Sequence, residues 1–176
     1  MKIAAFDPGS KNFGVAILNP ETLKIEAHWM NPYTVRTLGD GKSEQVNGFK
    51  KFLRTMRTKH GCTHVIAERF QARGSLSGIS IEVVSFMLGL AEHQFSNKAR
   101  FVIASQWKTA YNRNGLDLKE LYKDLWQKPN RITPHQIDAC LIGMWVCCKV
   151  RHVKLPGLKI VRQQIIDAAI KENKAC

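Results

Sequence analysis

The chain has 176 residues, of which 44% are hydrophobic and 23% are charged, as is typical of a single soluble globular domain. Its 27 Lys and Arg residues outnumber 14 Asp and Glu residues, and the formal net charge of +13 indicates a polyanionic partner such as nucleic acid. The longest apolar stretch, 139–148, is too short for a membrane helix, and Asp7 interrupts the N-terminus before a signal peptide could form.

Cysteine usage points to the same class of protein. The cysteines are odd in number and include no paired C-x-x-C arrangement, so the sequence predicts neither a disulfide framework nor a zinc ribbon. They are Cys62, Cys140, Cys147, Cys148 and Cys176. We expect reduced, buried thiols in a cytoplasmic protein that has no membrane contact and no small-molecule cofactor.

The predicted elements begin with a hairpin and then alternate between helix and strand. Two apolar runs are joined by the turn-forming segment 8–12, which indicates a β-hairpin. In chain order, we predict strands at 2–6, 13–18 and 23–30, a helix at 43–59, a strand at 63–67, a helix at 79–95, a strand at 100–104, and helices at 116–126 and 135–150. This order predicts an α/β fold with helices layered on the faces of a sheet.

Three acidic residues lie in apolar surroundings. Asp7 follows the first predicted strand and Glu68 follows the fourth, while Asp138 lies inside the apolar helix 135–150 on the same face as His135. A buried carboxylate is costly unless it is paired or binds a metal. Each residue also has an ordinary explanation when taken alone, because Glu68 could pair with a neighbouring Arg and Asp138 could be a helix-end charge.

Taken together, the three carboxylates favour a site for a hard cation, Mg²⁺ or Mn²⁺, held by oxygen ligands with the help of a neutral His. On a strongly basic protein, such a site predicts metal-assisted hydrolysis of a phosphodiester. Two ions could bind the scissile phosphate, one activating water and the other stabilising the leaving oxygen. The basic surface would then hold the nucleic-acid backbone.

Two short motifs contain these residues: 7–14 reads DPGSKNFG, and 135–139 reads HQIDA. In both, the chain resembles the RuvC family of Holliday-junction resolvases, within the RNase H-like superfamily, whose patterns are D-P-G-S-x-x-x-G and H/D-x-x-D-A. Glu68 matches the acidic residue that ends the family's fourth strand. Lys108 and Lys119 match a pair of lysines that the family places near the DNA. The likeness extends over most of the chain.

The resemblance implies an RNase H-like fold, with a five-stranded mixed sheet of three antiparallel and two parallel strands flanked by helices. It implies a metal-dependent endodeoxyribonuclease that cuts four-way (Holliday) junctions and other branched DNA, with paired symmetric nicks made by a homodimer. By resemblance, the ligands of two Mg²⁺ ions, for which Mn²⁺ could substitute, would be Asp7, Glu68, His135 and Asp138. The residues in contact with DNA would be Lys108, Lys119, Arg69, Phe70 and Arg73.

Other features depart from the family pattern or lie outside it. His135 replaces the Asp of some members, and the loop after the fourth strand differs, so a preference for a cleavage sequence is not carried over. Phe70 could stack at the branch point or equally be a core residue. The short chain and divergent middle would suit a phage-encoded version. We divide the chain into a nuclease domain at 1–150 and a basic C-terminal extension at 151–176, for which DNA contact and a solvated surface are both open. The apolar segment 79–95 is the candidate dimer helix.

Three other functions compete with this one. A D-x-G-x-x-x-x-G pattern also opens the phosphate loop of actin-like kinases, but those contain two copies of such a fold, and 176 residues without a repeat argue against them. The alternatives that stay open are a non-catalytic protein that binds branched nucleic acid and an RNase H-type nuclease acting on RNA–DNA hybrids. The intact acidic set argues against pure binding, because carboxylates repel phosphates, and the two motifs favour the resolvase branch.

Overall fold

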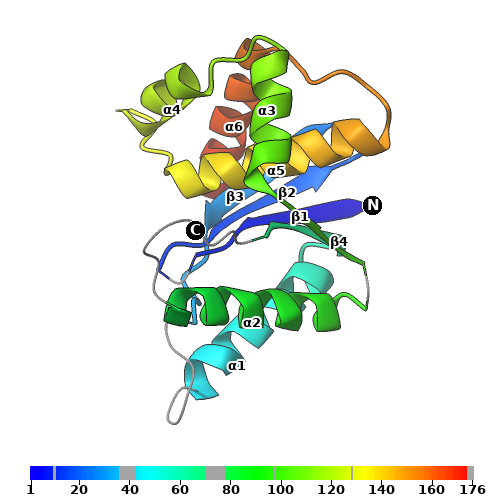
Figure 1. Ribbon diagram of the computed structural model, residues 1–176, viewed down its shortest axis with the longest axis vertical. Coiled ribbons are helices and arrows are strands. Elements are labelled where there is room, and N and C mark those ends of the chain that lie inside the picture. Colours follow the sequence, from blue (N-terminus) through cyan, green and yellow to red (C-terminus); the bar gives the residue numbers. More distant parts are fainter. Residues whose placement is uncertain (10, 36–42, 70–77, 97, 128, 174–176) are drawn as a thin grey trace.

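The computed structural model describes residues 1–9, 11–35, 43–69, 78–96, 98–127 and 129–173. Figure 1 shows a central sheet with helices on both sides. The elements in chain order are β1 (Lys2–Asp7), β2 (Gly14–Asn19), β3 (Lys24–Met30), α1 (Ser43–Thr58), β4 (Cys62–Glu68), α2 (Gly78–Gln94), β5 (Ala99–Val102), α3 (Ala104–Arg113), α4 (Leu118–Trp126), α5 (Pro134–Val150) and α6 (Leu158–Asn173).

The five strands form one mixed sheet in the order β3-β2-β1-β4-β5. The predicted hairpin is confirmed, since β1 pairs antiparallel with β2, and β2 in turn pairs antiparallel with β3. The other two strands are parallel, β4 to β1 and β5 to β4. The predicted sheet of three antiparallel and two parallel strands is therefore confirmed.

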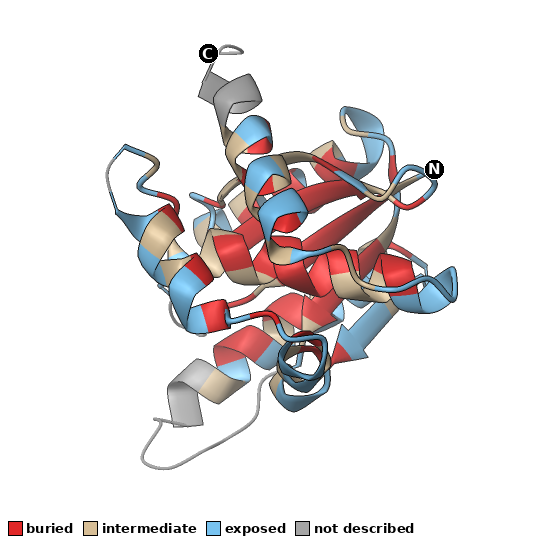
Figure 2. Ribbon diagram, turned by 90° about the horizontal axis from the view of Figure 1, so that it is seen from above, coloured by how far each residue is buried: buried red, intermediate tan, exposed pale blue. Residues whose placement is uncertain are grey.

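Each strand contributes to two separate cores, because successive side chains point to opposite faces of a sheet. In β1, Ala4 and Phe6 belong to the core under α1 and α2, whereas Ile3 and Ala5 belong to the core under α5. Figure 1 shows α1 and α2 on one side of the sheet and α3 to α6 on the other. The central strands β1 and β2 are almost entirely buried, and Figure 2 shows the buried strand residues in red.

The core on the α1–α2 side centres on a cluster of phenylalanines. Phe6, Phe13, Phe49 and Phe52 contact one another with ring centroids 5.2 to 6.2 Å apart. The predicted helix at 79–95 forms α2 and completes this core with a stripe of buried apolar residues at helical spacing. Its buried residues are Val83, Val84, Met87, Leu88 and Ala91.

On the other side of the sheet, α5 packs across β1 and β2, and α6 covers β3. Gly143 allows α5 to approach closely, since a Cβ at this position would overlap the side chain of Leu18. Val161 and Ile165 of α6 are fully buried. The buried His28 of β3 also contacts the Ile165 carbonyl oxygen through Nε2 at 2.8 Å. The helix in the basic C-terminal segment is therefore packed into the core of the molecule.

One predicted boundary was wrong, and one helix was missed. Residue 104 was expected to end a strand, but β5 ends at Val102 and Ala104 begins α3. The buried face of this helix consists of Trp107 and Tyr111, a single four-residue interval that is too short to give a distinctive apolar period. The other elements with predicted ranges match them to within one or two residues, and α6 lies in the basic C-terminal extension, for which no range was predicted. In the described ranges, none of the helices has the length and apolar character that a membrane span requires.

Candidate active site

Asp7 and Glu68 lie side by side at the carboxyl ends of two neighbouring strands. β1 and β4 pair in parallel with Phe6 aligned to Ala67, so the next residue of each strand is also adjacent to its counterpart. Glu68 comes two residues after Ile66, a member of the core under α5, and Asp7 follows the same alternation in β1. Both carboxylates therefore lie on the α5 side of the sheet.

The start of α5 brings His135 to Asp7, with Nδ1 of the imidazole 2.6 Å from Oδ2 of the carboxylate. A capping box fixes this end of the helix, because Thr133 accepts a hydrogen bond from the backbone of Gln136, whose side chain accepts one in return. Gly14 of β2 pairs with Asp7, and a Cβ at Gly14 would overlap the carbonyl oxygen of His135. The last glycine of the DPGSKNFG motif thus allows the helix backbone to approach the sheet.

Asp138 lies one turn after His135, and its side chain is 16% exposed. Its Oδ1 accepts a hydrogen bond from the Tyr122 hydroxyl of α4. Its Oδ2 lies 3.5 Å from the ammonium nitrogen of Lys108, which belongs to α3 and also lies 4.8 Å from the centre of the Trp107 ring. Three helices therefore meet at this one carboxylate.

Glu68 has an aromatic partner of its own. The indole nitrogen of Trp107 donates a hydrogen bond of 2.9 Å to Glu68 Oε2. Trp107 is fully buried and packs edge-on against Tyr111, whose hydroxyl donates a 2.9 Å hydrogen bond to the Leu141 carbonyl of α5. The hydrogen bond of Tyr111 thus connects α3 to α5, and the packing of Trp107 against Tyr111 positions the indole beside Glu68.

Burial and the charges of neighbouring carboxylates make Asp138 and Glu68 hard to ionise. The pKa of Asp138 is raised to about 6, chiefly by burial and then by the charge of nearby Asp7, against the hydrogen bond from Tyr122. Burial also raises the pKa of Glu68, against the hydrogen bond from Trp107, and the charges of the other two carboxylates add to the rise. The three carboxylates therefore lie within electrostatic reach of one another, and a nearby cation would stabilise their charged forms.

The pKa of His135 is also raised beside these charges, but in an imidazole a higher pKa favours the charged form. Its hydrogen bond with Asp7 raises the pKa of the imidazole, burial opposes that rise, and the charges of Asp7 and Asp138 reinforce it. The protonated imidazole is thus stabilised beside the acidic residues. Only the neutral form of the ring can ligate a cation beside the same carboxylate.

The donor set fits a hard divalent cation in its chemistry, since three carboxylates that repel one another stand beside an imidazole. The side chains are nevertheless engaged with protein partners. Asp7 is paired with His135, and Asp138 is held by Tyr122 and Lys108. Among the described residues, no three His, Cys, Asp or Glu side chains converge on one point as metal ligands. Binding a cation would require these pairs to open.

The predicted DNA-contacting residues fall into three groups. Lys108 lies at the acidic site. Lys119 is exposed in the first turn of α4, where its backbone N–H donates to the N-cap Asp117, and Arg69 is exposed directly after β4. Within the described part of the chain, neither of these two side chains contacts the carboxylates. Phe70 and Arg73 lie outside the described residues.

Sequence reasoning missed the two aromatic residues that hold the carboxylates. Trp107 directly precedes Lys108, and Tyr122 lies three residues after Lys119, one turn away on the same helix. A signal was available, because an indole N–H or a phenol O–H that is buried in a core needs a hydrogen-bond acceptor. The carboxylates that stand in apolar surroundings, Glu68 and Asp138, are acceptors of this kind.

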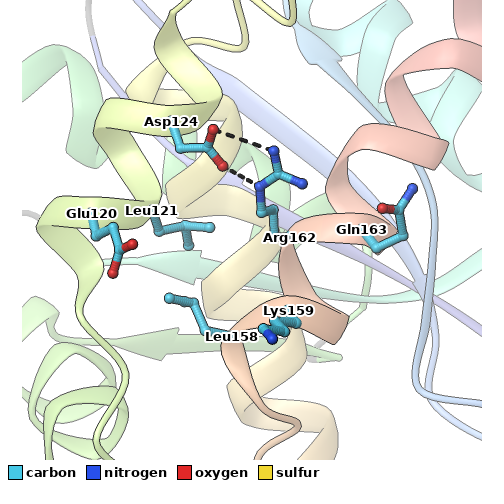
Figure 3. Close-up of a pocket in the computed structure, with 7 residues that line it drawn as sticks. All are labelled: Glu120, Leu121, Asp124, Leu158, Lys159, Arg162 and Gln163. Atoms are coloured by element: carbon cyan, nitrogen blue, oxygen red, sulfur yellow. Dashed lines mark hydrogen bonds and ion pairs between the residues drawn. The ribbon is translucent and has the colours of Figure 1, made fainter.

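A separate hollow of about 600 Å³ lies between α4 and α6. Figure 3 shows its lining, with the Asp124 carboxylate bridged to the Arg162 guanidinium and with Leu121 and Leu158 between the two helices. The lining contains none of the acidic-site residues. The ion pair links α4, which carries Tyr122, to the C-terminal helix.

The arrangement of strands and helices is shared with solved structures. RuvC of Thermus thermophilus in complex with a Holliday junction substrate matches with a TM-score of 0.61 and 16% sequence identity, over 89% of this chain and 99% of that chain. A second structure of T. thermophilus RuvC matches with a TM-score of 0.62 and 15% identity, over the same shares of the two chains. The chain has the RuvC fold.

Two further comparisons set the extent of this likeness. The yeast mitochondrial Holliday junction resolvase Ydc2 matches with a TM-score of 0.48 and 12% identity, over 99% of this chain and 86% of that chain, which is too distant to support further comparison. No protein-family model matches the chain, and no curated protein matches it by sequence. The RuvC fold is thus recognised through the structure, at a sequence identity that leaves the function to be argued from the site.

Proposed function

We propose that the protein is a metal-dependent endonuclease that cuts four-way DNA junctions. The observation that carries this proposal is that Asp7, Glu68 and Asp138 lie within electrostatic reach of one another, where α5 covers the carboxyl ends of β1 and β4 in a RuvC-type sheet, in a chain of net charge +13. A structure with the same fold is a complex with a Holliday junction substrate, which supports this class of DNA.

In this proposal, Asp7, Glu68 and Asp138 hold two Mg²⁺ ions with His135 as a further ligand, and Mn²⁺ substitutes. When bound, the ions activate a water molecule and stabilise the leaving oxygen of the scissile phosphodiester. The protein holds the carboxylates on the α5 side of the sheet. The capped N-terminus of α5 keeps His135 in contact with Asp7.

The proposed DNA surface includes three described basic residues. Lys108 contacts the Asp138 carboxylate. It is well placed to move to a substrate phosphate, because bound cations repel an ammonium group and the phosphate backbone attracts it. Lys119 and Arg69 extend the basic surface with exposed side chains. Phe70 and Arg73 are proposed as further DNA contacts on the basis of sequence alone.

We further propose that the protein acts as a homodimer, because two equivalent sites suit paired cuts in a junction of near-twofold symmetry. The proposed interface helix is α2. Its inner face is buried against the sheet, and its outer surface combines the half-buried Phe86 with the small exposed residues Ser85 and Gly89. Small residues would allow a second copy to pack closely.

The test is cleavage of an end-labelled four-way junction beside a linear duplex of matching sequence, first with Mg²⁺ and then with a chelator. We expect paired, symmetric nicks near the branch point, only in the junction and only with metal. Equal cutting of the duplex, or cutting that survives the chelator, would contradict the proposal. Tight junction binding without cleavage would indicate a binding protein, and cutting of RNA–DNA hybrids alone would indicate an RNase H-type nuclease.

A further inference from the structure

Both oxygens of the Asp138 carboxylate have hydrogen-bond partners from other helices. Oδ1 accepts from the Tyr122 hydroxyl, and Oδ2 lies 3.5 Å from Lys108 Nζ. These partners differ in what they would do when a cation binds. The ammonium of Lys108 is repelled by a divalent ion, whereas a neutral hydroxyl can stay in place. Tyr122 is therefore the partner that can hold Asp138 both before and after a metal binds.

Tyr122 is itself held firmly. It lies on α4 between Leu121 and Leu125, which are buried in the core under α5, and its own ring packs against that core. Asp117 caps the start of the helix by accepting hydrogen bonds from two backbone N–H groups. The ion pair between Asp124 and α6 braces the outer side of the same helix. The hydroxyl thus reaches Asp138 from a fixed support.

Glu68 also accepts a hydrogen bond from a buried aromatic side chain. Its Oε2 accepts a hydrogen bond from Trp107, whose ring is fully buried and fixed edge-on to Tyr111. Two of the three clustered carboxylates therefore each receive one hydrogen bond from a neutral aromatic donor. A carboxylate oxygen has two lone pairs, so an oxygen that accepts such a bond can still ligate a metal.

We propose that Tyr122 is a positioning residue that orients Asp138 for metal binding and that Trp107 does the same for Glu68. This inference rests on the proposed function, since it assumes that the carboxylates bind divalent cations. Hydrogen bonds from outside the ligand set fix the orientation of metal ligands, and their loss lowers metal affinity by about 10- to 100-fold. Tyr122 does not touch the substrate in this proposal, because it acts through Asp138.

Tyr122→Phe is the sharpest variant, because it removes only the hydroxyl and keeps the packed ring. Tyr111→Phe is the matched control, since it removes a buried hydroxyl that donates to the backbone carbonyl of Leu141 instead of to a carboxylate. Mn²⁺ binding to each folded protein is measured by electron paramagnetic resonance, without DNA. We expect the Kd for Mn²⁺ to rise about tenfold or more in Tyr122→Phe, and to stay at the wild-type value in Tyr111→Phe.

Two further proteins make the outcomes distinguishable. Asp7→Asn should weaken Mn²⁺ binding, and if it binds Mn²⁺ as the wild type does, the proposed metal site itself fails. If Asp7→Asn weakens binding while Tyr122→Phe does not, the metal site stands and the positioning role is overturned. Replacing Tyr122 by 3-fluorotyrosine keeps the donor and should retain the wild-type Kd. Loss of affinity in that protein would mean that the ring environment, and not the hydrogen bond, controls the site.

Discussion

The two sides of the sheet use the same strands for different purposes. On the α1–α2 side, phenylalanines such as Phe13 pack against aliphatic residues of both helices. On the α5 side, Trp107, Tyr111 and Tyr122 each donate a hydrogen bond to a carboxylate or a backbone carbonyl. Aromatic residues thus supply packing on both sides, and on the α5 side these three also supply hydrogen bonds.

This difference follows from the alternation of strand side chains. Asp7 and Glu68 point to the α5 side, so the helices on that side must both cover apolar surface and supply partners for carboxylates. Tryptophan and tyrosine meet both needs, because each has an apolar body and one polar group. The helices on the other side meet only the first need. The comparison therefore predicts that substitutions on the two sides will separate stability from function.

The largest effect on stability is expected for Phe13→Ala on the α1–α2 side. Phe13 is fully buried among three other phenylalanines, and truncation of such a ring leaves a cavity. We expect the free energy of unfolding to fall by about 3–5 kcal/mol, as measured by urea denaturation. Below its lowered Tm, the variant should bind and cut junction DNA as the wild type does. A selective loss of cleavage in the folded variant would contradict the prediction that the α1–α2 side contributes to stability and not to function.

On the α5 side, Asp138→Asn should stabilise the metal-free protein. The pKa of Asp138 is raised from 3.8 to about 6, so the contribution of this group to stability is present at low pH and is lost as the pH rises through about 6. The variant should gain up to about 3 kcal/mol over the wild type near pH 8, with the gain vanishing towards pH 4. Denaturation curves across this range measure it. A gain that is independent of pH would contradict the burial of a charged carboxylate.

Gly14→Ala tests the close contact between β2 and α5. The added methyl group would overlap the carbonyl of His135, so we expect a loss of about 1–3 kcal/mol and a displaced helix start. Because the hydrogen bond with Asp7 raises the pKa of His135, that pKa should fall towards its ordinary value in an NMR titration. Gly157→Ala is the control, since its methyl group meets open space. An unchanged His135 titration in Gly14→Ala would show that the contact does not set the geometry of the site.

The smallest effect concerns the proposed DNA surface. Lys119→Gln should reduce the slope of log K for junction binding against log salt by about one unit, because one phosphate contact is lost. Lys24→Gln is the matched control, since this exposed lysine lies at the opposite end of the sheet from Asp7. Equal slopes for the two variants would show that Lys119 makes no phosphate contact in the complex.

Much of the fold could be predicted because the strands carry strong local signals. The apolar run before Glu68 and the turn after Asp7 gave the pairing strands, and Asp138 stood out against the apolar residues of α5. Helix α3 escaped prediction because Trp107 and Tyr111 form only one helical interval. The contacts of Trp107 and Tyr122 with the carboxylates depend on long-range packing of helices, which no local pattern encodes.

The most direct test of the acidic edge as a catalytic site is the junction-cutting activity of Asp7→Asn. Asparagine keeps the shape of the side chain and removes its charge, while the basic surface that binds DNA is unchanged. We predict that the variant binds a four-way junction with wild-type affinity and that its rate of cleavage in Mg²⁺ falls by about a thousandfold or more, a loss of about 4 kcal/mol in transition-state stabilisation. Cleavage by Asp7→Asn at the wild-type rate would contradict the assignment of this site.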